Sequence, residues 1–192
     1  SEMLEVYDLK GNLLRLEERS RYYKKIKEEY SKKGKIKTQV RGIRLLLMNS
    51  QGRIYLQKRS KHKEGNPGLY DKTIGGHSSA GESQNLTVIR ECAEELGFPA
   101  AVLSSEEFDK ATKVTDLNII GIFKSVDHIN NFKSIRTSKN KKMFTQPWSS
   151  SFYIGYYDGA IRFADGESIG IEVFSLKELK QELKENPDKF TE

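Results

Sequence analysis

Apolar and polar residues alternate in several short segments of the chain, and this alternation predicts β-strands. Two such segments flank the turn sequence LKGN near the start, which predicts a hairpin because glycine allows the backbone angles of a tight turn. Two more strands are predicted around the turn sequence NSQG, where we expect the main domain to begin. The predicted strands cover residues 4–8, 13–18, 42–48, 53–60, 116–126, 150–159 and 171–175.

Apolar residues at helical spacing predict three helices. The first runs from a Ser20 cap to a Gly34 stop, with apolar residues at positions 22, 26 and 30 on one face. The second begins after Ser83 and ends at Gly97. The third begins at Ser175, where the sequence has a capping-box pattern. Strands flanked by helices predict an α/β sandwich with a mixed sheet.

Three glutamates crowd into five residues of the second predicted helix. On a helical wheel Glu91, Glu94 and Glu95 fall within an arc of about 100°, opposite an apolar face. Like charges this close repel one another, so they predict a bound divalent cation, and their oxygen ligands favour Mg²⁺. Arg90 is spaced to pair with Glu94 or Glu82, and a solvated acidic helix face is the alternative interpretation. The predicted core face comprises Leu86, Ile89, Cys92, Ala93 and Leu96.

The spacing of these residues relative to the glycines before them is far more specific than the glutamates alone. Every fixed position from Gly76 to Phe98 matches, and the stretch resembles the Nudix box. The resemblance implies a Nudix α/β/α sandwich at residues 39–192, with an N-terminal hairpin and helix extension at residues 1–38. It also implies hydrolysis of a nucleoside diphosphate derivative, assisted by Mg²⁺ or Mn²⁺. The implied metal ligands are Gly75, Glu91, Glu94 and Glu95.

The flanks of the box resemble the isopentenyl diphosphate isomerase branch of this superfamily, and more specifically its hydrolase-like members. That resemblance implies that Arg59 and Lys63 bind the diphosphate. His77 matches a metal-binding histidine of the isomerases and joins the predicted substrate-binding set, with a polar loop residue as the alternative. The isomerases need a cysteine in the segment that here reads TIGGH and two glutamates on the strand that here reads WSSSFYIG. Both are absent, and Cys92 falls on the predicted core face, so we expect a hydrolase, with an isomerase as the alternative.

Hydrolysis requires a base that takes a proton from the attacking water. Glu94 is one candidate, and Arg90 and Glu95 complete the predicted catalytic part of the box. In this superfamily the base often lies beyond the box, and Glu167 in the sequence ADGESIG is the distal candidate. A solvated turn carboxylate is the alternative for Glu167.

Residues 127–148 form a polar and basic insertion, which we predict to be a long loop. A catalytically idle Nudix domain that binds nucleotides or RNA would use its cations, Arg136, Lys139, Lys141 and Lys142. An idle domain would be expected to lose box glutamates, whereas this chain keeps them all. The insertion also lacks an organised aromatic pattern for base stacking, so nucleic acid is disfavoured as a partner.

Composition narrows the class of protein further. The 192 residues suit one domain with an extension, and the net charge of +6 favours an anionic partner such as a small-molecule diphosphate. No apolar run reaches the roughly 18 to 20 residues of a membrane span, and no secretion signal is evident. The single cysteine excludes an intramolecular disulfide framework. We therefore expect a cytoplasmic enzyme without a membrane partner, and the sequence leaves a homodimer open.

Overall fold

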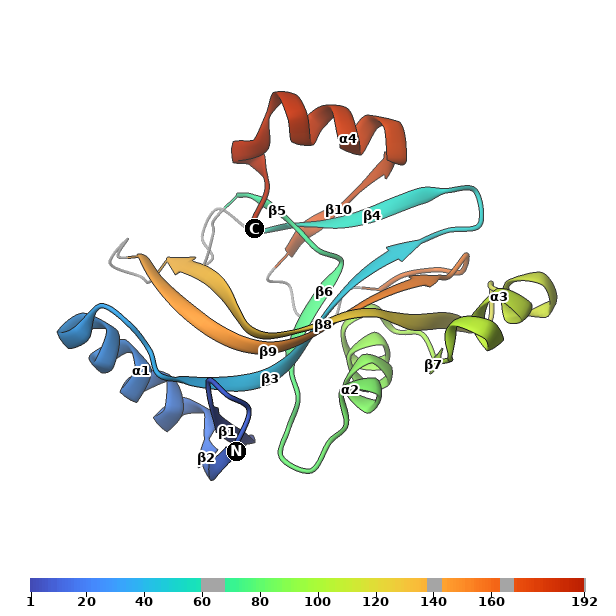
Figure 1. Ribbon diagram of the computed structural model, residues 1–192. Helices are drawn as coiled ribbons and strands as arrows, with labels where there is room; N and C mark the ends of the chain where they lie inside the picture. The colour runs from blue at the N-terminus through green and yellow to red at the C-terminus, as the bar shows by residue number, and fades with distance from the viewer. Residues whose placement is uncertain (60–67, 138–142, 163–167, 192) are drawn as a thin grey trace.

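A strongly curved mixed β-sheet forms the centre of the fold (Figure 1). The computed structural model describes residues 1–59, 68–137, 143–162 and 168–191. The main path of the sheet has the order β10-β4-β3-β9-β8-β7, and four further strands pair beside it. The strands are β1 (Met3–Asp8), β2 (Leu13–Glu18), β3 (Thr38–Met48), β4 (Arg53–Arg59), β5 (Tyr70–Asp71), β6 (Ile74–His77), β7 (Ala100–Val102), β8 (Gly121–Thr137), β9 (Met143–Tyr156) and β10 (Ser168–Ser175).

Strand β3 organises the sheet because it has neighbours on both of its sides. It pairs antiparallel with β1, β4 and β6, and parallel with β9 from the pair Val40–Trp148 to the pair Met48–Tyr156. Its side chains alternate between the two faces of the sheet, as they do in any strand. The combination of parallel and antiparallel neighbours confirms the predicted mixed sheet.

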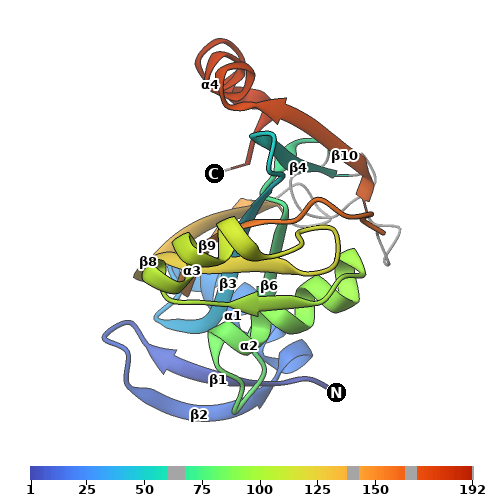
Figure 2. The same cartoon turned by 90° about the vertical axis from the view of Figure 1, so that its right-hand side faces the viewer.

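Helices cover both faces of this sheet. Helix α2 (Gln84–Glu91) covers one face, where Val88 and Cys92 share a core with Ile43 of β3. Helices α1 (Arg19–Lys33) and α4 (Leu176–Glu185) cover the opposite face, where Tyr22 and Leu179 are buried. The three layers confirm the predicted α/β/α sandwich. Figure 2 shows α4 and β10 at one end of the sheet and the β1–β2 hairpin at the other.

The N-terminal hairpin and helix share the sheet and core of the rest of the chain. Strand β1 pairs with β2, which confirms the predicted hairpin, and it also pairs with β3. Tyr22 and Ile26 are buried, as their spacing predicts, and Gly34 ends α1 with a φ of 69°. The predicted Ser20 cap is wrong: α1 begins at Arg19, and the Ser20 hydroxyl donates instead to the Glu18 carboxylate (2.7 Å).

The polar insertion is not the predicted long loop. Strands β8 and β9 continue through it and pair from Ile122–Tyr156 out to Thr137–Met143, with two register shifts. Phe144 and Trp148 are buried in the core beneath α1, which explains why a polar segment forms a stable ladder. Lys139, Lys141 and Lys142 of the predicted basic group lie outside the described residues.

The predicted limits of the second helix are confirmed. The Ser83 hydroxyl accepts a hydrogen bond from the Leu86 amide (3.2 Å), and Gly97 adopts a φ of 76° at the other end. Between α2 and Gly97 the chain forms a π-helical turn, Cys92–Leu96, a feature that is common at functional sites.

The wheel prediction of the core face is only partly correct. Leu86 and Ala93 are exposed, whereas Val88, Cys92 and Leu96 are buried. These buried residues are four apart, and a π-helical turn, with more residues per turn than an α-helix, accommodates that spacing. The π-helical turn begins at Cys92, so it affects the positions of Ala93 and Leu96, whereas Leu86 lies in the regular α-helical part.

The remaining helices are capped by serines. Ser175 accepts from the Glu178 amide (3.1 Å) at the start of α4, as predicted. Helix α3 (Ser105–Val114), capped by Ser104, was not anticipated from the sequence. Among the described residues, no helix is long and apolar enough to cross a membrane.

Candidate metal and diphosphate site

Strand β6 carries two adjacent glycines along an open edge of the sheet. In the described part of the chain β6 pairs only with β3. The Ser78 amide donates to the Arg41 carbonyl (3.0 Å), so these two residues form a hydrogen-bonded pair. Hydrogen-bonded and non-hydrogen-bonded pairs alternate along an antiparallel ladder, so the pair Arg44–Gly75, three positions further on, is not hydrogen-bonded. The Gly75 carbonyl is therefore directed away from β3, toward the open edge.

Glu91 at the end of α2 lies directly against this strand. A Cβ built on Gly76 would come within 2.5 Å of Glu91 Oε1, so a side chain at this position would force the carboxylate to shift. The Glu91 side chain is 12% exposed and accepts a hydrogen bond from Arg90 Nη1 at 3.2 Å. The fold thus holds one box carboxylate beside the glycine pair.

Arg90 forms hydrogen bonds and ion pairs with several acidic residues and also donates a hydrogen bond to β6. Its Nε and Nη2 donate to the two Glu82 oxygens at 2.8 and 3.0 Å, and Nη2 also donates to the His77 carbonyl at 3.0 Å. Its Nη1 reaches Glu94 Oε2 at 3.2 Å, so Arg90 makes both of the ion pairs that the sequence predicts. These contacts describe a positioning residue, whose hydrogen bonds also hold the pKa of Glu82 below its usual range.

The surroundings of the Glu91 carboxyl group disfavour its ionised form. Burial raises the pKa of Glu91 to about 7; the Arg90 guanidinium opposes this, and Glu95 and Glu94 add to it. A carboxyl group with this pKa is only partly ionised at neutral pH. A cation placed among these side chains would stabilise the ionised form.

The donor chemistry of this face fits a hard divalent cation. Three carboxylates project from one helical segment beside a carbonyl on an open strand edge, and such oxygen ligands suit Mg²⁺ or Mn²⁺. Glu91 is held in its glycine cradle, whereas the Glu94 side chain is 59% exposed. As the side chains stand, no three acidic, histidine or cysteine groups among the described residues converge closely enough to hold a metal ion. The ligand set of Gly75, Glu91, Glu94 and Glu95 therefore stays a prediction.

Comparisons with known proteins identify the family of the chain. Residues 38–192 match the NUDIX domain. The chain belongs to the Nudix family. It is 28% identical over 152 residues to an isopentenyl-diphosphate Delta-isomerase of Serratia proteamaculans, covering 79% of this chain and 70% of the relative.

Two further matches cover part of the sequence and the fold, respectively. An uncharacterised Nudix hydrolase of Pseudomonas aeruginosa is 43% identical over 63 residues, 33% of this chain and 37% of that protein. The crystal structure of DR0079 from Deinococcus radiodurans shares the fold, with a TM-score of 0.64 at 16% identity, covering 100% of this chain and 93% of that one. Both Nudix hydrolases and an isomerase are thus among the relatives.

Arg59, the predicted diphosphate ligand, ends β4 beside β5. Its Nη1 donates to Asp71 Oδ2 at 3.1 Å, and its side chain is 14% exposed. Asp71 also accepts from Lys72 Nζ (2.7 Å) and from the Thr191 hydroxyl (2.9 Å). Burial opposes ionisation of Asp71, but the Lys72 and Arg59 cations prevail and lower its pKa to about 2. Arg59 is therefore held in place by a carboxylate that stays ionised.

His77, predicted to bind substrate, faces the N-terminal helix. Its Nε2 lies 2.5 Å from the Tyr23 hydroxyl, and its ring centroid lies 4.7 Å from that of Trp148. The Tyr23 hydroxyl is also bonded by Gln146 Nε2 (2.9 Å) and by Arg136 Nη1 (3.2 Å). Burial, together with nearby arginines, lowers the pKa of His77 well below its usual value. The ring thus has protein partners here, and its predicted contact with substrate is untested.

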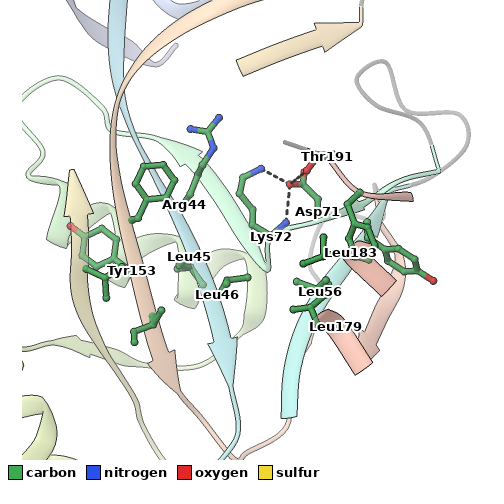
Figure 3. Close-up of a pocket in the computed structure, with 15 residues that line it drawn as sticks. Arg44, Leu45, Leu46, Leu56, Asp71, Lys72, Tyr153, Leu179, Leu183 and Thr191 are labelled. Carbon is green, nitrogen blue, oxygen red and sulfur yellow. Dashed lines mark hydrogen bonds and ion pairs between the residues drawn. The ribbon is translucent and has the colours of Figure 1, made fainter. Parts of the chain in front are cut away.

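A cavity of about 330 Å³ is lined by residues of β3, β4, β5, β8, β9 and α4. Figure 3 shows the nitrogens of Arg44 and Lys72 and the Asp71 carboxylate on one side of it and leucines on the other. A Cβ on Gly75 would collide with Lys72 Cε, so the lysine side chain passes over that glycine. The sequence did not single out these three residues, because Arg44 on β3 is distant in sequence from the adjacent Asp71 and Lys72, and none of them belongs to a motif.

Two predicted site residues, Lys63 and Glu167, lie outside the residues that the structure describes. Their roles as diphosphate ligand and distal base therefore stay predictions. The histidine at position 62 lies in the same undescribed segment as Lys63.

Proposed function

We propose that the protein is a Mg²⁺-dependent hydrolase, able to use Mn²⁺, that cleaves a diphosphate linkage in a nucleoside diphosphate derivative or a related phosphorylated metabolite. One observation carries the proposal. Glu91 is held against Gly76 by the Arg90 network, with Glu94 and Glu95 on the same helical segment and the Gly75 carbonyl at the adjoining strand edge. A buried carboxylate in repulsive surroundings is a costly arrangement, and a cation-binding role accounts for it.

The chain's own groups then have separate tasks. Glu91, Glu94 and Glu95 would hold the cation, with the Gly75 carbonyl. When bound, the cation supplies charge neutralisation at the phosphoryl oxygens and lowers the pKa of a water molecule. Arg59 would donate hydrogen bonds to phosphate oxygens that remain uncovered.

The reaction needs one proton acceptor. Water oxygen attacks phosphorus, the bridging P–O bond breaks, and the displaced phosphate leaves with the bonding electrons. Glu94 is the most accessible described carboxylate of the box, 59% exposed, and would take the proton of the attacking water. Glu167, predicted from the sequence, is the other candidate for this step.

The test is a screen for phosphate or nucleotide release with and without Mg²⁺. The panel comprises nucleotide sugars, dinucleoside polyphosphates, oxidised nucleotides, coenzymes and prenyl diphosphates. Glu95→Gln should lower turnover of the best substrate by orders of magnitude, because it removes a ligand charge while keeping the shape. Glu106→Gln on α3, whose side chain is 82% exposed, is the matched control and should keep the native rate. Native turnover in Glu95→Gln with unchanged Mg²⁺ dependence would refute the proposal.

A further inference from the structure

Strand β2 forms an outer edge of the sheet. In the described part of the chain it pairs only with β1, and Figure 2 shows it at the end of the molecule opposite α4. The strand is apolar for an open edge, because the leucines at positions 13, 14 and 16 are 56, 50 and 55% exposed. Natural proteins commonly protect such edges with charges or a covering element, and an apolar open edge is a site where another strand can add.

The ladder between β1 and β2 determines which backbone groups of β2 face outward. The Arg19 amide donates to the Glu2 carbonyl (2.9 Å), so these two residues form a hydrogen-bonded pair. Hydrogen-bonded and non-hydrogen-bonded pairs alternate along an antiparallel ladder, so the pair Glu5–Leu16, three positions further on, is not hydrogen-bonded. The amide and carbonyl of Leu16 are therefore directed away from β1, toward the open edge.

A second copy of β2 fits this edge, and charge selects the register of the pairing. In an antiparallel pair related by a two-fold axis, side chains opposite each other share a face, so one residue lies opposite its own copy. An axis at Arg15 or at Glu17 would place identical charges directly opposite each other, which destabilises a strand pair. An axis at Leu16 instead places Leu16 against its own copy, and it places Arg15 opposite Glu17 of the second copy on both sides of the axis.

We propose that the protein forms a homodimer in which β2 pairs antiparallel with β2 of a second copy, with Leu16 facing its own copy. The pairing joins two sheets edge to edge, covers Leu16, and gives Arg15, 42% exposed, a second carboxylate besides Glu17 of its own chain. The regular part of β2 is short, because its register with β1 shifts between Val6 and Tyr7. The interface is correspondingly small, and we expect a dissociation constant in the micromolar range.

The first test is the oligomeric state as a function of concentration. Sedimentation equilibrium of the full chain in EDTA, from about 1 to 500 µM, should show a monomer–dimer equilibrium with a micromolar Kd. A chain that stays monomeric over this range would overturn the proposal and would leave the edge to a strand of a different protein. The measurement uses neither metal nor substrate, so its outcome is independent of the proposed hydrolase activity.

A charge introduced at the axis tests the location of the interface. Leu16→Lys places two like charges directly opposite each other, and lysine is a residue with which natural edge strands prevent pairing. The variant should raise the Kd of the dimer at least tenfold. Val114→Lys is the matched control and should keep the native Kd, because this side chain is 84% exposed on α3, which lies apart from β2 in Figure 1. Thermal melts identify a variant that fails to fold, and a native Kd in folded Leu16→Lys would refute the proposal.

A cysteine crosslink tests the register. The one native cysteine, Cys92, is buried, so an introduced surface cysteine is the accessible thiol. Leu16→Cys should form an intermolecular disulfide under mild oxidation, because the Cα atoms of a hydrogen-bonded pair lie about 5.5 Å apart, within the span of a disulfide. Leu13→Cys is the matched control: it would lie roughly 20 Å from its own copy and should stay reduced. Equal crosslinking of the two variants, or none in a Leu16→Cys dimer, would overturn the proposed pairing.

Discussion

The raised pKa of Glu91 makes the stability of the metal-free protein depend on pH. Its folded-state pKa of about 7 lies above its ordinary value of 4.5. Below pH 4.5 the carboxyl group is protonated in both the folded and the unfolded state, so it does not lower the free energy of unfolding. As the pH rises toward 7, the unfolded chain releases this proton first, so the unfolding free energy falls and stays lower above pH 7. The difference amounts to about 3 kcal/mol at most.

Glu91→Gln isolates this contribution, because glutamine keeps the shape of the protonated carboxyl group and does not titrate. Urea unfolding of both proteins is measured in EDTA at pH 5 and pH 8. Between pH 5 and pH 8 the unfolding free energy of the native protein should fall by about 2 to 3 kcal/mol more than that of the variant. Adding Mg²⁺ at pH 8 should raise the unfolding free energy of the native protein again but should not raise that of Glu91→Gln. Equal pH dependence in the two proteins would show that Glu91 is not held in a costly charged state.

Three more predictions concern the site and its support. Arg59→Ala should lower kcat/KM for a verified diphosphate substrate about ten- to a hundredfold in steady-state kinetics. A folded variant with native kcat/KM would show that Arg59 does not bind the diphosphate. Incubation with isopentenyl diphosphate and Mg²⁺ should give no dimethylallyl diphosphate, because no cysteine occupies the TIGGH segment, and ordinary turnover would contradict the hydrolase proposal. Tyr23→Phe should lower the unfolding free energy by about 1 to 3 kcal/mol in urea titrations, because the Nε2 group of buried Gln146 loses the Tyr23 hydroxyl as its acceptor, and an unchanged midpoint would contradict this.

The sequence was most informative where chemistry depends on closely spaced residues. Arg90, Glu91 and Glu94 lie on one short helical segment, so their spacing alone predicts that they meet, and the ion pairs of Arg90 confirm this part. The caps at Ser83 and Gly97 were equally predictable, because each depends on local backbone geometry.

The long ladder of β8 and β9 could not be predicted from its own composition. Asp, Asn and Lys residues between positions 127 and 142 weaken the local strand pattern. Tertiary packing overrides it, because Phe144 and Trp148 are buried beneath α1 while Asp127, His128 and Asn130 are exposed. The missed cavity has a related cause, since Arg44 and Lys72 approach each other only when β3 and β6 pair.

The two glycines before the helix show what a motif leaves undetermined. In the sequence Gly75 and Gly76 are adjacent and equivalent, and both read as points where the backbone approaches a cation. In the strand they face opposite sides: the missing side chain of Gly76 admits Glu91, and that of Gly75 admits Lys72. A side chain at one position would displace an acidic residue, and at the other a cationic residue. The glycine pair therefore separates the carboxylate face from the cationic cavity, and the Gly75 carbonyl at the open edge is the backbone group that lies between them.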